Sequence, residues 1–186
     1  MNTAEHIVDC YYRIVKNCFT MNDAKVINGI NRQLDVLAVN LISNEHFHIE
    51  SSVTHRLGWA PKADALKKIF EKKFLGLPEE RPGKKTDFSL GREYKKNILD
   101  TYRAYGLDPS KIQRIFVCWV LHPKSPADQL LHAFEKDHKM KIQIISFRDT
   151  ILPELRHAVG TANYDDEILR TIGFIKEHDA QTKNNN

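Results

Sequence analysis

Residues 33–55 read QLDVLAVNLISNEHFHIESSVTH, and this stretch decides the fold. Residues 33–40 are rich in Leu and Val, and residues 47–53 alternate between two faces, as β-strands do. The Ser43-Asn44 pair between them is typical of a turn. Two consecutive apolar segments joined by turn residues predict an antiparallel hairpin.

Each predicted strand of the hairpin carries one carboxylate, Asp35 in the first and Glu50 in the second. A two- or four-residue loop would place Asp35 opposite Glu50 or Ser52, so both carboxylates would share one face; an odd-length loop or a bulge would break this alignment. Burial of a carboxylate is costly unless something compensates its charge. Two carboxylates with waters and a phosphate oxygen are a typical Mg²⁺ arrangement.

Hydrophobic periodicity organises the rest of the chain around this hairpin. Helices are expected at residues 3–19, 62–75, 92–105, 126–137, 147–159 and 165–177, and further strands at 24–30, 112–121 and 141–145. This order predicts an α/β fold with a mixed central β-sheet flanked by helices. The helical crossover before residues 112–121 should make that strand parallel to the one at 47–53.

Composition fits one domain over residues 1–180, followed by a disordered tail at 181–186. The chain has 186 residues, 41% of them hydrophobic, and a net charge of +4 (28 basic minus 24 acidic). Such a surplus permits a polyanionic partner without requiring one. No GxGxxG, P-loop or GxSxG motif supports an α/β enzyme of small-molecule metabolism.

The three cysteines, Cys10, Cys18 and Cys118, form no CxxC pair. Neither a disulfide framework nor a thiolate zinc site is therefore expected, and buried reduced thiols are the favoured interpretation. No basic start precedes an apolar run, and no stretch approaches the ~20 apolar residues of a membrane span. A cytoplasmic protein without membrane contact is expected.

The order helix, three strands, helix and strand, with Leu-Asp-Val at 34–36 and Ile-Glu at 49–50, resembles the PD-(D/E)XK nuclease superfamily. The resemblance covers residues 3–121 and leaves 122–180 as an extension. It implies a restriction endonuclease-like core and a metal-dependent nuclease that hydrolyses phosphodiester bonds. It further implies Mg²⁺ or Mn²⁺ as cofactor, a nucleic-acid partner that we expect to be DNA, and a possible homodimer.

By this likeness, Asp35 and Glu50 are the two acidic metal ligands, and Ser51 supplies a backbone carbonyl to the metal. Glu5 matches a carboxylate that some members of the superfamily add from the first helix. An equally good interpretation makes Glu5 a first-turn acid that the helix dipole favours.

One position departs from the superfamily pattern, because Ser52 stands where the motif lysine would be. A serine hydroxyl supplies no positive charge, so either the basic group comes from elsewhere or the site is inactive. Lys62 and Lys67 on the following helix are the expected sources, with His55 and Arg56 also close in sequence. The inactive alternative is a nuclease-fold module that binds nucleic acid or a protein partner.

Basic and polar residues around the hairpin are candidate phosphate contacts. The predicted nucleic-acid-binding residues are Arg32, Thr54, His55, Arg56 and Lys68. Most lysines at positions 62–73 could equally form an ordinary solvated helix face.

Overall fold

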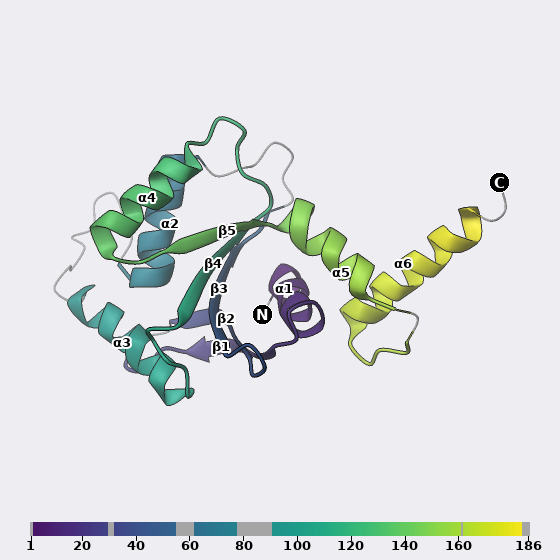
Figure 1. The fold of residues 1–186 in the computed structure, drawn as a ribbon, viewed down its shortest axis with the longest axis horizontal. Helices are drawn as coiled ribbons and strands as arrows, with labels where there is room; N and C mark the ends of the chain where they lie inside the picture. Colours follow the sequence, from purple (N-terminus) through teal and green to yellow (C-terminus); the bar gives the residue numbers. More distant parts are fainter. Residues whose placement is uncertain (1, 30–31, 55–61, 78–90, 161, 184–186) are drawn as a thin grey trace.

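A computed structural model describes residues 2–29, 32–54, 62–77, 91–160 and 162–183, in which helices cover both faces of a five-stranded sheet (Figure 1). The strands are β1 (Phe19–Lys25), β2 (Gln33–Asn40), β3 (Glu45–Ser52), β4 (Ile112–Cys118) and β5 (Ile142–Ser146). They lie in the order β1-β2-β3-β4-β5. The first three are antiparallel and the last two pairings are parallel, which confirms the expected mixed sheet and crossover.

Helices alternate with the later strands. They are α1 (Thr3–Ile14), α2 (Ala63–Leu75), α3 (Gly91–Ala104), α4 (Ala127–His138), the π-helical turn η2 (Phe147–Ile151), α5 (Leu152–Ala158) and α6 (Glu167–Lys183). Because β5 pairs with β4, the segment after residue 122 contributes a strand to the same sheet. Among the described residues, no helix is long and apolar enough to cross a membrane.

The hairpin register decides where the carboxylates lie. The β2–β3 ladder begins at Asn40↔Glu45 and continues to Val36↔Ile49, so the next position outward sets Asp35 opposite Glu50. The loop between the strands has four residues, as the parity argument requires. Asp35 and Glu50 therefore lie on the same face of the sheet, as expected.

Two hydrophobic cores sandwich the sheet. One face carries a cluster that joins α1 and α5 to the sheet, with members Tyr12, Val36, Phe47, Ile49 and Leu155. The other face packs against α2, α3 and α4 through Phe70, Phe74, Phe116, Phe134, Ile98 and Tyr102. Figure 1 shows α1 on the side of the sheet opposite α2, α3 and α4. Because side chains alternate along a strand, Asp35 and Glu50 face the second group of helices.

Several predicted boundaries were wrong. The first helix ends at Ile14 rather than at residue 19, and Asn17 follows with φ 52° in the left-handed region. This turn lets β1 begin at Phe19, five residues before the expected strand, and pair with β2. At the other end, α6 continues to Lys183, so residues 181–183 are helical rather than disordered. Most of the expected loop at 76–91 lies outside the described residues.

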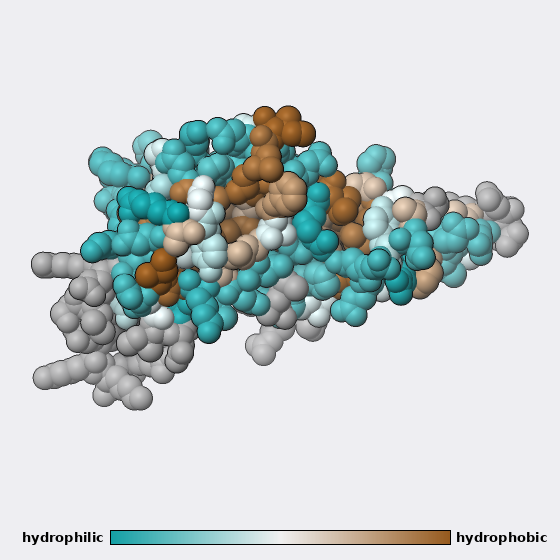
Figure 2. All heavy atoms as spheres, turned by 90° about the horizontal axis from the view of Figure 1, so that it is seen from below, coloured by the Kyte–Doolittle hydropathy of each residue, from teal (hydrophilic) through white to brown (hydrophobic). Residues whose placement is uncertain are grey.

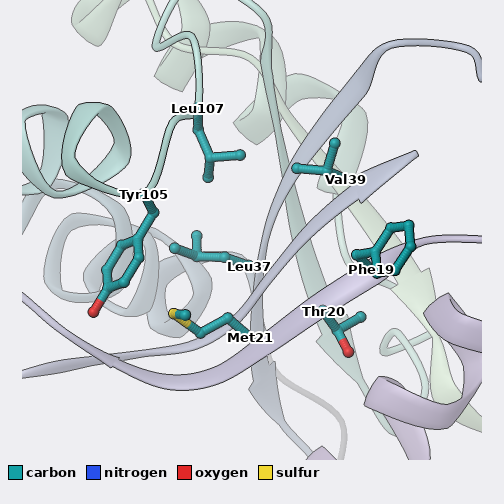
Figure 3. A pocket seen from close by; sticks show the side chains of 7 residues that line it. All are labelled: Phe19, Thr20, Met21, Leu37, Val39, Tyr105 and Leu107. Carbon is teal, nitrogen blue, oxygen red and sulfur yellow. The ribbon is translucent and has the colours of Figure 1, made fainter. Parts of the chain in front are cut away.

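Apolar side chains also reach the surface near the β1 edge of the sheet. The most exposed are Phe19, Leu41 and Ile42, the last two in the β2–β3 turn. Figure 2 shows hydrophobic residues gathered among hydrophilic ones on the face seen from below. A shallow pocket lies nearby, lined by Phe19, Thr20, Met21, Leu37, Val39, Tyr105 and Leu107 (Figure 3). Its lining carries no charged side chain.

Candidate active site

Three charged side chains meet at the carboxyl end of β3. The Lys73 Nζ lies 2.8 Å from Asp35 Oδ2 and 2.8 Å from Glu50 Oε2. Glu50 is fully buried, Asp35 is largely buried, and the lysine side chain keeps 28% of its surface exposed. The ammonium therefore bridges the two carboxylates at the end of a side chain that is partly exposed.

Helix α2 delivers this lysine because Lys73 lies on its buried stripe. Leu66, Phe70 and Phe74 are fully or almost fully buried. Lys73 follows Leu66 by seven residues and Phe70 by three, which is the spacing of one helix face. Phe74 packs its ring 5.1 Å from the ring of His48, on the strand that carries Glu50. The helix is thus fixed to the sheet directly beside the carboxylates.

The last turn of α2 is held by two features. Gly76 ends the helix with φ +73°, and an added Cβ would lie 2.6 Å from the Tyr94 Cβ, so glycine is required there. Arg32 donates from Nη2 to the backbone carbonyls of Lys72 and Lys73. The last carbonyls of a helix receive no hydrogen bond from a following turn of the helix. The Arg32 guanidinium supplies that donor here and so caps the turn that carries Lys73.

Glu50 is oriented from its other side by a buried chain of hydrogen bonds. His48 Nε2 lies 2.7 Å from Glu50 Oε1, and His48 Nδ1 lies 2.7 Å from the Tyr102 hydroxyl. An ionised carboxylate can only accept, so Nε2 carries the proton and donates to Glu50. Burial lowers the pKa of His48 despite the opposing effect of Glu50, so the ring is neutral and Nδ1 accepts from Tyr102.

The two carboxylates have opposite pKa shifts. Burial alone would raise the pKa of Glu50, but the His48 hydrogen bond and Lys73 hold that pKa below its ordinary value. Burial, followed by repulsion from Glu50, raises the pKa of Asp35 to about 6. Lys73 and a 2.8 Å hydrogen bond from the Ser51 backbone N–H to Asp35 Oδ2 oppose that rise. Glu50 is therefore the permanently charged member of the pair.

The side chain of Lys73 is positively charged at neutral pH. Burial alone would lower its pKa, but the adjacent Glu50 and Asp35 outweigh burial and raise it. One ammonium thus faces two carboxylates, and the Arg32 guanidinium adds a second positive charge that interacts with both of them. The charges of these four groups balance at neutral pH, so a bound cation would compete with Lys73 and Arg32 for the carboxylates.

The donor atoms fit a hard divalent cation. Glu50 Oε2 is buried, touches Lys73, and makes no hydrogen bond within the described residues. Both contacts of Asp35 given above use Oδ2. Carboxylate oxygens are the ligands that Mg²⁺ and Mn²⁺ prefer. Asp35 and Glu50 are accordingly the residues that could hold such an ion.

The structure brings together only some of the predicted site residues. Lys62, Lys67 and Lys68 are exposed on α2, and the ammonium beside the carboxylates belongs to Lys73 instead. Ser52, two residues after Glu50 in β3, occupies the position where the superfamily has its motif lysine. Lys73 was overlooked because the lysines of this helix were treated as a solvated face, although the seven-residue spacing from Leu66 marks it as buried.

The remaining predicted residues lie as follows. Glu5 accepts from the Asn2 backbone N–H in a capping box on α1, across the sheet from Asp35 and Glu50. Arg32 caps α2 rather than presenting its guanidinium to a phosphate. Ser51 contributes its N–H to Asp35, and Thr54 lies half-buried just beyond β3. His55 and Arg56 fall outside the described residues.

Comparison with known proteins finds no matching family model, no similar curated protein and no similar solved structure.

Proposed function

We propose that this protein is a metal-dependent nuclease that hydrolyses phosphodiester bonds in DNA, with a restriction endonuclease-like core. The observation that carries the proposal is the position of Lys73 Nζ, 2.8 Å from each of Asp35 and Glu50. The superfamily pattern combines two acidic residues with a basic group. Ser52 does not supply that group, and Lys73 does. Helix α2 supplies it in place of strand β3.

Each residue has a distinct role in this proposal. Mg²⁺ or Mn²⁺, when bound by Asp35 and Glu50, supplies a Lewis acid that polarises the scissile phosphate and activates water. His48 keeps Glu50 ionised and fixed in orientation. Lys73 offsets the negative charge that develops on the phosphate and positions the attacking water. The Lys73 side chain is 28% exposed, so a substrate at the surface could reach it.

One observation favours a second function. Lys73 already neutralises part of the carboxylate charge, so the three groups could be a purely structural ion pair. In that case the protein is an inactive module of the same fold that binds nucleic acid or a protein partner. A homodimer remains a proposal for either function.

A plasmid-nicking assay separates the two. We expect supercoiled DNA to be nicked in Mg²⁺ or Mn²⁺ and left intact in EDTA, with the Asp35→Ala variant inactive. Structured and single-stranded DNA and RNA are tested in parallel. A wild-type protein that binds Mg²⁺ but cleaves none of these substrates would replace the nuclease proposal with the binding module.

Mg²⁺ affinity should depend on pH through Asp35. Because its pKa is raised to about 6, Asp35 binds a proton in the folded protein as pH falls through that value. The proton competes with the metal, so affinity should fall roughly tenfold per pH unit below about 6 and be constant above about 7. Calorimetric titration between pH 5 and pH 8 measures this. Equal affinity at pH 5 and pH 7 would contradict metal binding by Asp35.

The exposed lysines of α2 should contribute to nucleic-acid binding. Phosphate contacts release counterions, so affinity should fall steeply with salt, and Lys67→Glu with Lys68→Glu should weaken binding and flatten the slope. The matched control is Lys111→Glu with Lys141→Glu. These exposed lysines directly precede β4 and β5, which run parallel to β3, so they lie at the end of the sheet opposite Glu50. Equal losses in both double variants, measured by fluorescence anisotropy, would argue against a specific role for α2.

A further inference from the structure

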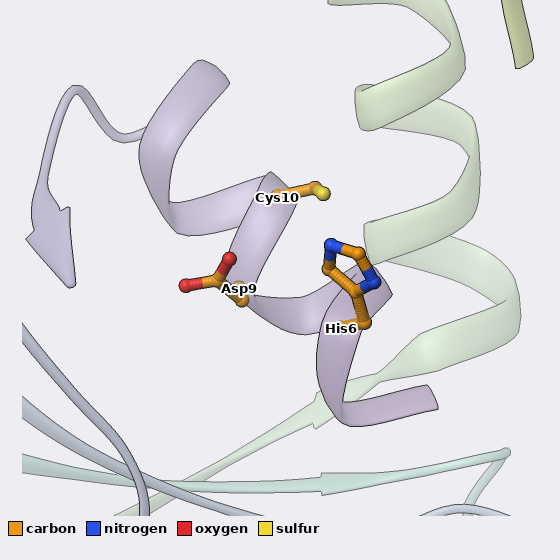
Figure 4. A group of neighbouring side chains, drawn as sticks. All are labelled: His6, Asp9 and Cys10. Carbon is orange, nitrogen blue, oxygen red and sulfur yellow. The ribbon is translucent and has the colours of Figure 1, made fainter. Parts of the chain in front are cut away.

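A second cluster of ligating side chains lies on the other face of the sheet, where α1 meets the start of α6. His6 and Cys10 lie one helical turn apart on α1 and point to the same side of it, while the Asp9 carboxylate extends toward the other side in this view (Figure 4). Ligand atoms of these three residues all lie within 4.8 Å of one another. Cys10 is fully buried and Asp9 is 4% exposed.

Asp166 adds a fourth ligating group from far along the chain. Its Oδ2 lies 3.0 Å from His6 Nε2, and both of its carboxylate oxygens lie 3.5 Å from Cys10 Sγ. Its Oδ1 also accepts from the backbone N–H groups of Ile168 and Leu169, which caps α6. The cluster therefore joins the first helix to the last.

We propose that His6, Asp9, Cys10 and Asp166 bind one transition-metal ion of the Zn²⁺ class. Imidazole, thiolate and carboxylate are the ligand types that Zn²⁺ uses, in tetrahedral sites with bonds of about 2.0–2.3 Å. Such bonds make ligand–ligand distances of roughly 3.3–3.7 Å. The 3.0 and 3.5 Å distances to Asp166 are close to these values. Asp9 is the third ligand from α1, with a ligand atom within 4.8 Å of those of His6 and Cys10.

Asp9 provides an independent indication of a missing partner. Its Oδ1 is buried and has no hydrogen-bond partner within the described residues. Native proteins rarely leave a buried carboxylate oxygen unsatisfied, because desolvation without a partner is costly. A metal ion is a natural partner for this atom.

Arg13 contacts three of the four proposed ligands and would compete with an ion for them. Its guanidinium donates from Nε to Asp9 at 2.9 Å, and from Nη2 to Asp166 at 2.6 Å and to Cys10 Sγ at 3.3 Å. The side chain is 35% exposed, so it can turn toward solvent as the ion enters. Binding also releases the Cys10 thiol proton to solvent, since the thiolate is the ligand.

Four protein ligands leave no open position, so the bound ion would be structural rather than catalytic. It would fasten α6 to α1, the helix that covers the sheet face opposite Asp35 and Glu50. The absence of a CxxC pair argued against zinc in the sequence. That argument covers sites built from several cysteines and does not apply to one cysteine joined by His6 and two aspartates.

Co²⁺ is a suitable probe because its thiolate complexes absorb in the near-ultraviolet, whereas oxygen-only complexes do not. Full-length protein is stripped with EDTA, kept reduced and titrated with Co²⁺. We expect a thiolate charge-transfer band that saturates at one equivalent and is displaced by Zn²⁺. Zn²⁺ should also raise the melting temperature of the stripped protein. Absence of the band in the wild type would overturn the proposal and leave an ion-pair cluster.

Variants assign the band to these residues. The Cys10→Ser variant should lose it, while Cys18→Ser, at another buried thiol, should keep it. Arg13→Met should bind Co²⁺ more tightly, because it removes the competing cation. His6→Ala serves if Cys10→Ser does not fold, and should weaken binding. Persistence of the band in Cys10→Ser would overturn the proposal. Asp35→Asn should keep the band, which separates this outcome from failure of the proposed nuclease site.

Discussion

Replacing Lys73 with Ala is expected to reduce DNA cleavage by about a hundredfold or more, the usual cost of losing one charged contact in a transition state. Lys73 is in direct contact with both Asp35 and Glu50, whereas Arg32, which also interacts electrostatically with both, donates its hydrogen bonds to the backbone of α2. Steady-state cleavage of a defined duplex at saturating Mg²⁺ measures the loss.

Although DNA cleavage should fall in the Lys73→Ala variant, Mg²⁺ binding should not. The ammonium now stands between the two carboxylates, and its removal leaves them facing each other without a counter-charge. Mg²⁺ should therefore bind the Lys73→Ala variant as tightly as the wild type or more tightly. Calorimetry beside the cleavage assay distinguishes a catalytic lysine from one that merely supports the metal site.

Two further variants complete this test. Lys73→Arg keeps the charge but changes its shape and reach, so partial activity is expected. Lys67→Ala, exposed on the same helix, is the matched control and should cleave normally. If Lys73→Ala and Lys67→Ala cleave equally well, Lys73 has no catalytic role. If Mg²⁺ no longer binds to Lys73→Ala, the lysine is part of the metal site's architecture.

The hairpin that carries the carboxylates was predictable from the sequence for a physical reason. Side chains alternate along a strand with a period of two, so the loop length alone decides which residues share a face. The four-residue loop gives the register that sets Asp35 opposite Glu50. The parallel β3–β4 pairing was predictable on similar grounds, because a helical crossover in one sheet has few alternatives.

The lysine was harder to predict because its position depends on tertiary packing. Helical spacing places Lys73 on the stripe of Leu66 and Phe70, but a lysine on such a stripe usually extends its ammonium to water. Only the sheet beneath it, with two carboxylates at that position, explains its burial. The expected sources, Lys62 and Lys67, lie toward the start of α2, whereas the ammonium beside the carboxylates comes from its last turn.

Hydrogen-bond partners that lie far apart in the chain could not be predicted from the sequence. His48 and Tyr102 are 54 residues apart, and each alone looks like an ordinary strand or helix residue. The complete burial of His48 depends on α2 and α3 packing on this face of the sheet, where Phe74 and Tyr102 contact its ring.

His48→Ala is expected to lower the free energy of unfolding at pH 7 by about 2–5 kcal/mol, the usual cost of truncating a large buried side chain to alanine. The variant leaves Glu50 Oε1 and the Tyr102 hydroxyl without their partner and removes a ring that packs on Phe74. Tyr102→Phe deletes only the hydroxyl and should cost about 1–3 kcal/mol. His48→Gln keeps a donor for Glu50 and should recover part of the loss. Urea unfolding monitored by circular dichroism gives all three values.

The difference between wild type and His48→Ala should shrink as pH is lowered from 7 toward 4. In the wild type, the pKa of Glu50 is held below its ordinary value, so its contribution to stability is present above its unfolded pKa of about 4.3 and is lost as pH falls through the folded pKa. Without the His48 hydrogen bond, that pKa rises, and the buried carboxylate takes up a proton at higher pH than in the wild type. Between pH 7 and pH 4 the variant therefore gains stability relative to the wild type, whose Glu50 contribution is lost only below about pH 4.3. An energy difference that stays constant from pH 7 to pH 4 would show that the ring of His48 stabilises the fold by packing alone, and that Glu50 does not depend on it for its charge.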